Sequence, residues 1–359
     1  MTKKVAPKKK RHTTLNLLSE NIIDGVYKGK GVFNIMSLAD PSDPLAVKQC
    51  LPTGLPNLDR VLCVSESGAW GLPVGKIISV KSKPGVGKTS FLLKVASQAY
   101  RRGGAVAIVE SERALDMGYV RKLNGPEVDH YMISQPDTLE EAFDTIDYLL
   151  DICIKRREKA GVGFPFLIIV DSFSAFPPKS ELEGGFEIKG RALGEHARIA
   201  SLACRKLTGK IDKAKAILLL SHQFKSKIGA FWGSPNTNIG GEAFNYHDSI
   251  CISLYRTTAI KDDKNIICGH FGIAKTTKNK LYPPHREIKF KIINGMGFKR
   301  DFAILDFLIG AKCVVKKGAW FHFRGDKDLK WQGINNFSPF LRTSKRARNL
   351  VRKSLGSLS

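Results

Sequence analysis

Short apolar runs alternate with amphipathic stretches from about residue 50 onwards. The apolar runs are GKIISVKS (75–82), GAVAIVES (104–111), HYMISQP (130–136), PFLIIVDS (165–172), AILLLSHQ (216–223) and SICISLYR (249–256). Short runs that are apolar almost throughout are typical of strands buried on both faces of a sheet. Because helical stretches separate them, the pattern predicts an α/β fold with a mainly parallel sheet.

Two of the intervening stretches, 89–102 and 138–157, have helical periodicity. In the second, the apolar side chains that recur every three or four residues and share one face are Leu139, Phe143, Ile146, Leu150 and Cys153. Asp137 and Glu140 have the spacing of a capping box, which predicts where this helix begins.

The pattern changes at both ends of the alternating core, which we place at 46–297. Residues 1–13 are polar and basic, and we expect a disordered arm. Residues 14–45 predict a short helix, a brief strand and a linker with two prolines. Shorter, mixed segments at 298–359 predict a small α/β C-terminal domain with a basic tail.

Composition excludes several classes of protein. The chain has 359 residues, enough for two or three domains, and 43% of them are apolar, so wholesale disorder is excluded. No run approaches the roughly 18 apolar residues of a membrane span, and the N-terminus lacks the apolar stretch of a secretory signal. The seven scattered cysteines contain no C-x-x-C pair, which predicts reduced, packed thiols. We therefore expect an intracellular protein.

The chain is strongly basic, with 58 Lys and Arg against 33 Asp and Glu and a net charge of +25. Six basic side chains lie in 1–11 and six more in 342–359, with no acid in either segment. This excess of positive charge creates an electrostatic field that attracts polyanions such as nucleic acids. The alternative is that the charge only keeps the protein soluble. The run PKKKR at 7–11 also fits a weak nuclear import signal, but an arm that contacts DNA fits it better.

A phosphate-binding loop follows the first apolar run and opens a helix. Its residues are Ser82, Lys83, Pro84, Gly85, Val86, Gly87, Lys88, Thr89 and Ser90. The glycines let backbone N–H groups converge on phosphate oxygens, Lys88 reaches the β- and γ-phosphates, and the Thr89 hydroxyl binds Mg²⁺. The loop predicts a site for ATP and Mg²⁺.

Acidic side chains follow two other apolar runs. Asp171 ends a buried strand beside the loop, where it can hold Mg²⁺; the alternative is a cap for the next helix. Glu110 and Glu112 both end a neighbouring strand, where a carboxylate can orient and deprotonate an attacking water. Position alone does not choose between these two glutamates.

A long segment at 221–249 is rich in Gly, Asn, Lys and aromatic residues, and we predict a DNA-binding loop at about 224–243. Lys225 and Lys227 supply positive charge, and Phe231 and Trp232 supply rings on which the bases of single-stranded DNA can stack. The pair Gly240 and Gly241 offers a hinge for this loop. Phe231 or Trp232 could insert between DNA bases. The alternative is that these aromatic rings pack against the protein's own core.

Longer motifs extend beyond the phosphate loop. They are TGLPNLDRVL, ESERALDMGYVRKL, SQPDTLEEAF, VDSFSAFPPKSELEG, KIGAFWGSPNTNIGGEAF, KTTKNK and KKGAWFHFRGDK. With these motifs in this order, the chain resembles the RecA family of bacterial-type DNA strand-exchange recombinases from about residue 14 to about residue 353.

The resemblance implies a RecA-like P-loop ATPase core and an ATP-dependent recombinase in homologous recombination and DNA repair. It implies a homo-oligomeric helical filament on single-stranded DNA, with ATP and Mg²⁺ at the subunit interfaces. The filament would pair with homologous duplex DNA, exchange strands, and hydrolyse ATP in response to DNA. The expected location is the cytoplasm of a bacterial cell or of a phage-infected host.

The resemblance also assigns residues around the nucleotide. It favours Glu112 as the catalytic glutamate, and Asp116 and Tyr119 as the pair that contacts adenine. Gln223 matches the glutamine that senses the γ-phosphate. Lys278 and Lys280 match two lysines that reach the neighbouring subunit's ATP, in the role of arginine fingers.

Further matches concern DNA and assembly. Arg198 and Arg205 match contacts to the DNA backbone, on the helix after a first DNA loop at about 184–194. The segment 14–36 matches the helix and strand that dock on the adjacent protomer, so 14–45 is the expected oligomerisation segment.

Four features depart from the family pattern. Ser82 replaces the first loop glycine, which slightly constrains the loop's first turn. His222 stands where the family usually has Asn, and Leu193 is nearest to the usual methionine wedge. The basic C-terminus replaces an acidic tail, which predicts less restrained duplex binding and a divergent, phage-encoded member.

Two other functions fit part of the sequence. One is an accessory filament protein that binds ATP and DNA without exchanging strands, and the other is a hexameric helicase. Glu112 together with Lys278 and Lys280 argues against the first. The N-terminal segment and the KNK motif favour a filament over a closed ring.

Overall fold

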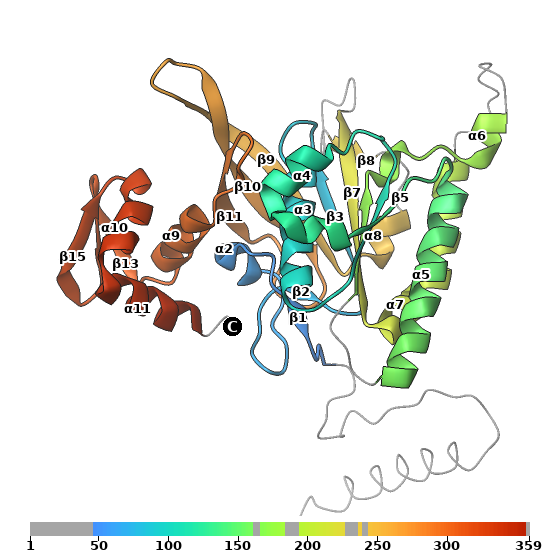
Figure 1. The fold of residues 1–359 in the computed structure, drawn as a ribbon, viewed down its shortest axis with the longest axis horizontal. Coiled ribbons are helices and arrows are strands. Elements are labelled where there is room, and N and C mark those ends of the chain that lie inside the picture. The colour runs from blue at the N-terminus through green and yellow to red at the C-terminus, as the bar shows by residue number, and fades with distance from the viewer. Residues whose placement is uncertain (1–45, 161–165, 184–193, 227–235, 239–242, 357–359) are drawn as a thin grey trace, which may run out of the picture. The chain divides into compact units, whose positions relative to one another are not determined.

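The computed structural model describes residues 46–160, 166–183, 194–226, 236–238 and 243–356 (Figure 1). The arm at 1–13, the segment at 14–45 and most of the predicted DNA loops at 184–194 and 224–243 therefore lie outside the described residues. The following elements belong to the unit Val47–Ser359.

A mostly parallel sheet, ten-stranded in the described chain, positions the functional residues. In spatial order its strands are β12 (Gly297–Phe298), β11 (Glu287–Ile293), β10 (Ile267–Asn279), β9 (Ile250–Lys261), β3 (Lys76–Ser82), β7 (Ala216–Ser226), β6 (Phe166–Asp171), β4 (Val106–Glu110) and β5 (Met132–Ser134), with β8 (Asn236–Asn238) against β7. The strands from β9 to β5 pair in parallel, whereas β9 to β12 pair antiparallel. The six apolar runs are these six parallel strands, so the predicted α/β fold is confirmed.

Helices cover both faces of the sheet (Figure 1). They are α3 (Lys88–Arg101) and α4 (Met117–Asn124) on one face, and α5 (Leu139–Ala160) and α7 (Glu195–Ala214) on the other. Ile78 and Val80 of β3 pack in the first layer with Phe91, whereas Ile77 packs in the second. Because both faces are buried, these strands contain few polar residues.

The start of α5 differs from the prediction. Asp137 and Glu140 do not form the predicted capping box, because Thr138 is the capping residue. Its Oγ1 accepts a hydrogen bond from the Glu141 N–H (3.2 Å), and the Glu141 carboxylate accepts one from the Asp137 N–H (2.9 Å). The cap thus lies one residue later than predicted, and Glu141 accepts from the residue before the cap instead of from the N–H of Thr138. Asp137 forms an ion pair with Arg113.

Short elements connect these layers. They are β1 (Cys50–Leu51), α2 (Pro56–Asp59), β2 (Leu72–Pro73), η1 (Pro126–His130), η2 (Phe173–Ala175), α6 (Lys179–Glu183) and α8 (Ala243–His247). The seven cysteines are free thiols, as the sequence predicted. No helix in the described ranges has the length and apolar character needed to cross a bilayer.

The last part of the chain has a hydrophobic core of its own. Its elements are α9 (Arg300–Gly310), β13 (Val314–Lys317), β14 (Trp320–Phe323), β15 (Asp326–Gln332), η3 (Ile334–Asn336), α10 (Phe337–Thr343) and α11 (Lys345–Leu355). The three strands form an antiparallel sheet. The Trp331 ring stacks on Phe321 and Phe340, with ring centroids 5.5 and 5.0 Å away, and anchors α10 to this sheet.

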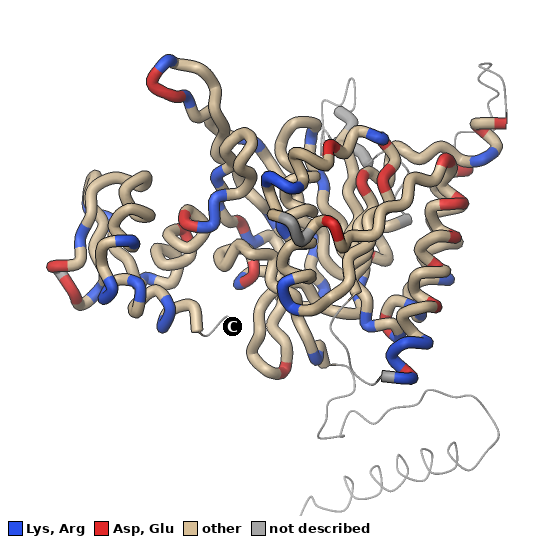
Figure 2. The backbone as a smooth tube through the Cα atoms, in the orientation of Figure 1, with Lys and Arg blue, Asp and Glu red and all other residues tan. Residues whose placement is uncertain are grey.

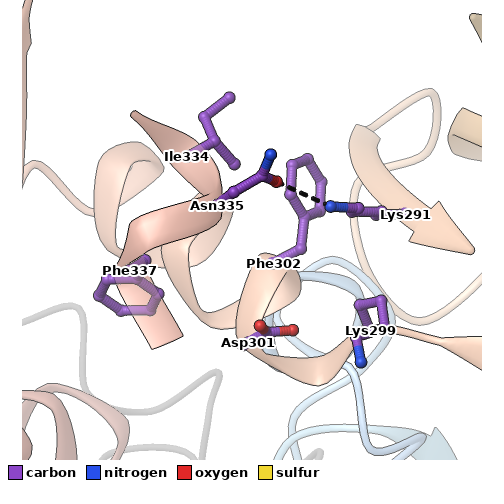
Figure 3. A pocket seen from close by; sticks show the side chains of 7 residues that line it. All are labelled: Lys291, Lys299, Asp301, Phe302, Ile334, Asn335 and Phe337. Carbon is purple, nitrogen blue, oxygen red and sulfur yellow. Dashed lines mark hydrogen bonds between the residues drawn. The ribbon is translucent and has the colours of Figure 1, made fainter. Parts of the chain in front are cut away.

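Polar contacts join this core to the large sheet (Figure 3). The Lys291 ammonium of β11 donates to the Asn335 side-chain oxygen (2.9 Å) beside a small pocket that Lys299 and Asp301 also line. The Asp306 carboxylate of α9 accepts from the Lys289 N–H of β11 (3.3 Å) and from the Asn57 amide of α2 (2.8 Å). These contacts place α9 against the antiparallel half of the sheet.

Candidate active site

A cleft of about 500 Å³ lies at the carboxyl ends of β3, β6 and β7, where parallel sheets commonly bind ligands. Its predicted lining residues are Pro84, Gly85, Gly87, Lys88, Thr89, Ser90, Glu112, Tyr119, Asp171 and Gln223. The cleft also has a wall that sequence analysis missed, formed by His270, Ile292, Ile293, Asn294 and Gly295. The fold thus brings most of the predicted nucleotide residues together.

The phosphate loop has the backbone conformation that its glycines allow. Gly85 and Gly87 have φ of 71° and 107°, values that other residues rarely adopt. A Cβ on Gly87 would lie 2.5 Å from Ile292 Cδ1, so the Ile292 side chain would have to shift, and any side chain would be strained by the positive φ. Since α3 begins at Lys88, its N-terminus opens towards the cleft and favours anions there.

Ser82 pairs regularly with Gln223 of β7 in the parallel sheet. It is the buried last residue of β3, and its hydroxyl donates to the Lys83 carbonyl (2.7 Å). The Lys88 ammonium lies 3.4 Å from the same hydroxyl. Ser82 therefore places a polar group beside Lys88, and its effect on the loop's first turn stays a prediction.

Lys88 is a buried cation with acidic neighbours. Burial lowers its pKa, while the charges of Asp171 and Glu112 act in the opposite direction. A phosphate in the cleft would supply a further counter-charge.

Thr89 and Asp171 offer oxygen ligands side by side. The Thr89 hydroxyl donates to Asp171 Oδ2 (2.7 Å), and the Ser221 hydroxyl donates to Asp171 Oδ1 (2.5 Å). Hydroxyl and carboxylate oxygens are the donors that Mg²⁺ prefers. Thr89 and Asp171 would therefore fit a magnesium ion.

The geometry separates Glu112 from Glu110. Glu112 is exposed at the cleft, where its Oε1 accepts from the Gln223 amide (3.0 Å) and the Ser172 hydroxyl (3.2 Å). Glu110 is buried, and its carboxylate accepts from the Ala114 N–H (2.9 Å) and the Gln135 amide (2.7 Å). Glu110 thus holds the turn after β4, whereas Glu112 is available to a ligand.

Gln223 and His222 point to opposite sides of β7, as neighbours on a strand do. Gln223 lines the cleft, and its backbone N–H donates to the Ser174 hydroxyl (3.2 Å). His222 is buried on the other side, with Nε2 3.2 Å from the Ser79 hydroxyl and its ring against Phe173. The departure at His222 therefore concerns the core under the site.

Burial lowers the pKa of His222 to about 3, and the charge of Lys81 acts in the same direction. The unfolded chain takes up a proton near the ordinary value of 6.5 and the folded chain does not, so stability is lost as pH falls below 6.5. We expect His222→Asn to remove about 2 kcal/mol of this loss at pH 5. Urea unfolding of the wild type and of His222→Asn at pH 7.5 and pH 5 measures this difference. Equal losses of unfolding free energy in the two proteins would refute the prediction.

Tyr119 and Asp116 lie at the start of α4. The Tyr119 hydroxyl lies 2.8 Å from the Ser90 hydroxyl, at the cleft. Asp116 caps the helix by accepting from the Tyr119 N–H (2.5 Å) and is absent from the described lining of the cleft. Asp116 therefore positions Tyr119 in this structure.

Lys278 and Lys280 lie at the end of β10, apart from the cleft that the described residues form. Both ammonium groups donate to the Tyr246 carbonyl, at 3.3 and 2.8 Å. Burial and the charge of Lys280 lower the pKa of Lys278. The two lysines are thus held together at a place distinct from the protomer's own phosphate loop.

The predicted DNA-contacting residues are only partly described. Arg198 and Arg205 lie two turns apart on α7, and both are exposed. Lys225 belongs to β7, which leads away from the cleft. The other predicted residues, Lys227, Phe231, Trp232, Gly240 and Gly241, lie outside the described ranges, so intercalation and core packing remain open alternatives.

Comparison with known proteins gives consistent matches. The family model described as the RecA N-terminal domain matches residues 18–299. Protein RecA 2 of Myxococcus xanthus is 36% identical over 314 residues, which cover 88% of this chain and 81% of the relative. Protein RecA of Ruegeria pomeroyi is 37% identical over 293 residues (82% and 78%), and Protein RecA of Acidiphilium cryptum is 38% identical over 314 residues (88% and 84%).

Proposed function

The chain belongs to the RecA family, and we propose that the cleft described above is the ATP site through which this member drives strand exchange. RecA proteins are DNA-dependent ATPases that form filaments on single-stranded DNA and exchange strands with homologous duplex DNA, using ATP and Mg²⁺. The chain is accordingly a recombinase. RecA homologues are cytoplasmic bacterial proteins, and we place this chain in the same compartment; a phage origin stays a prediction.

The phosphate loop would hold the triphosphate. Its N–H groups and the N-terminus of α3 face phosphate oxygens, and Lys88 neutralises charge between the β- and γ-phosphates. Thr89 and Asp171 would hold Mg²⁺, which stabilises the charge that develops on the transferring phosphate. Tyr119, fixed through Ser90, would lie against the base.

Glu112 would act on the attacking water. Its carboxylate is exposed at the cleft, and the Gln223 amide donates to one of its oxygens. The other oxygen remains for a water, which Glu112 orients and deprotonates. A γ-phosphate that attracts Gln223 would free Glu112 and shift the end of β7, which leads to the DNA-binding loop.

Lys278 and Lys280 would act on the neighbouring protomer's site. In one protomer they converge on the Tyr246 carbonyl, apart from their own phosphate loop. In a filament, they would cross the joint and neutralise charge as the phosphoryl group leaves. The active site would then be complete only when two protomers meet.

The protein would bind DNA through contacts with its phosphate backbone. Arg198 and Arg205 present two charges about two turns apart on one exposed helix face, and Lys225 and Lys227 would add charge at the second loop. Sequence recognition would come from base pairing between the DNA strands, because protein contacts with phosphates carry no sequence information.

The observation that carries this proposal is that Lys88, Thr89, Asp171, Glu112 and Gln223 line one cleft. We would test it with a strand-exchange assay that uses a fluorescent homologous duplex and a heterologous control duplex. Exchange that needs ATP, Mg²⁺, homology and an intact Lys88 supports the proposal. Filaments that bind ATP and DNA but exchange nothing would leave the accessory-protein alternative.

The C-terminal helix α11 should contribute to duplex binding. Lys345, Arg352 and Lys353 are exposed on it, and Figure 2 shows basic residues but no acidic ones along α11. Replacing all three with Gln should weaken duplex binding and reduce the slope of log affinity against log salt by up to about 2.7, since each phosphate contact contributes about 0.9.

The control replaces three exposed basic residues of α5, namely Lys155, Arg156 and Lys159, with Gln. It changes the net charge equally on a helix that lies across the sheet from α11 (Figure 1). Fluorescence anisotropy over a salt series measures both variants. Equal slopes in the α11 and α5 variants would show that only net charge matters.

A further inference from the structure

His270 connects the antiparallel half of the sheet to the phosphate loop. It lies on β10, 184 residues after Val86, and it lines the cleft. The side chain is only 5% exposed, and its Nε2 lies 3.2 Å from the Val86 carbonyl oxygen. Its ring also packs edge to face against the Phe290 ring, with centroids 6.2 Å apart.

The hydrogen bond determines how one peptide of the loop is turned. The carbonyl and the N–H of a trans peptide point in opposite directions. Because the Val86 carbonyl is held towards β10, the Gly87 N–H points away from β10. A phosphate bound in the loop would accept hydrogen bonds from backbone N–H groups that converge on it.

The peptide between Val86 and Gly87 needs a contact from outside the loop to hold it, because the glycines around it restrain the backbone little. Gly85 and Gly87 have φ of 71° and 107°, and glycine rotates its peptides at little cost. A stiffer residue at Gly87 would be strained, because L side chains rarely adopt a φ of 107°. The loop therefore combines a conformation that other residues rarely adopt with a contact from β10 that restrains it.

The ring is suited to donating this bond at neutral pH. Burial lowers the pKa of His270, the hydrogen bond to Val86 acts in the opposite direction, and Arg256 lowers it further. A neutral ring carries one N–H, and a carbonyl can only accept, so this proton is on Nε2. Protonation of the other nitrogen would leave the bond in place.

We propose that His270 is a positioning residue of the phosphate loop, which keeps the Gly87 N–H directed at the nucleotide's phosphates through the Val86 carbonyl. The inference rests on the proposed function of the loop as an ATP site. It goes further because it makes a donor on β10, outside the loop's own sequence, responsible for phosphate affinity.

The test compares His270→Gln, whose amide can donate to the same carbonyl, with His270→Phe, which keeps a ring but has no donor. Binding of a fluorescent ATP analogue should be about tenfold weaker for His270→Phe and within about twofold of the wild type for His270→Gln. KM for ATP should follow the same order with kcat nearly unchanged. Competition by adenosine, which has no phosphate, should be the same for all three proteins.

Three results would overturn the inference: wild-type affinity in His270→Phe, equal weakening in both variants, or an equal loss of adenosine binding. Thermal unfolding checks each fold, and His270→Met replaces the Phe variant if that protein does not fold. Lys88→Ala separates the two proposals. If Lys88→Ala binds the analogue like the wild type, the ATP site itself is misassigned. If Lys88→Ala binds it weakly while His270→Phe binds it like the wild type, this inference alone fails.

Discussion

Replacing Glu112 with Gln is expected to lower DNA-stimulated ATP hydrolysis by about two to four orders of magnitude, with ATP binding nearly unchanged. The amide keeps the shape of the carboxylate but cannot accept a proton from water. Glu112 is exposed at the cleft and contacts Gln223 and Ser172 without supporting the fold elsewhere, so the variant should fold normally. Single-turnover hydrolysis measures the chemical step, and equilibrium binding of an ATP analogue measures affinity.

Glu110→Gln is the matched control, two residues earlier in the chain. Glu110 is buried and accepts hydrogen bonds from Ala114 and Gln135, so its loss should lower thermal stability more than it lowers the rate of the chemical step. If Glu110→Gln abolishes hydrolysis while Glu112→Gln stays within tenfold of the wild type, the two roles are reversed.

The double variant Lys278→Ala with Lys280→Ala should lose about three to five orders of magnitude in hydrolysis, the range measured for arginine fingers. It should still bind ATP, because neither lysine lines the described cleft of its own protomer. Both ammonium groups lie on the Tyr246 carbonyl, so they have to leave this contact to act across a joint.

Mixing this double variant with Lys88→Ala tests action across the joint. The double variant supplies an intact cleft, and Lys88→Ala supplies the two lysines. Random assembly pairs an intact cleft with intact lysines at roughly a quarter of the joints, which should restore a similar share of wild-type activity. A mixture that shows only the sum of its two parts would contradict action in trans.

The sequence predicted the parallel half of the sheet and most of the cleft for physical reasons. Strands buried on both faces must be apolar almost throughout, and their carboxyl ends meet at one edge. Asp171 and Gln223 each follow such a run, and the phosphate loop follows another, so their meeting could be anticipated. The resemblance chose Glu112, and the structure gives a reason, since Glu110 is occupied by the turn after β4.

The parts that sequence analysis missed depend on contacts between distant segments. His270 and Ile292 reach the phosphate loop only because β10 and β11 pair antiparallel beside β9, and no local signal reports that register. Asp116 caps α4 and so positions Tyr119, which its spacing alone did not reveal. His222 is next to Gln223 in the sequence, yet alternation along the strand places its side chain in the core.

The most direct test of the account is ATP hydrolysis with and without single-stranded DNA, for the wild type and Lys88→Ala. The account predicts strong stimulation by DNA in the wild type and none in the variant, because one cleft both binds the triphosphate and responds to DNA through Gln223. If ATP and DNA both bind while wild-type turnover stays at the level of Lys88→Ala, the coupled ATPase is contradicted.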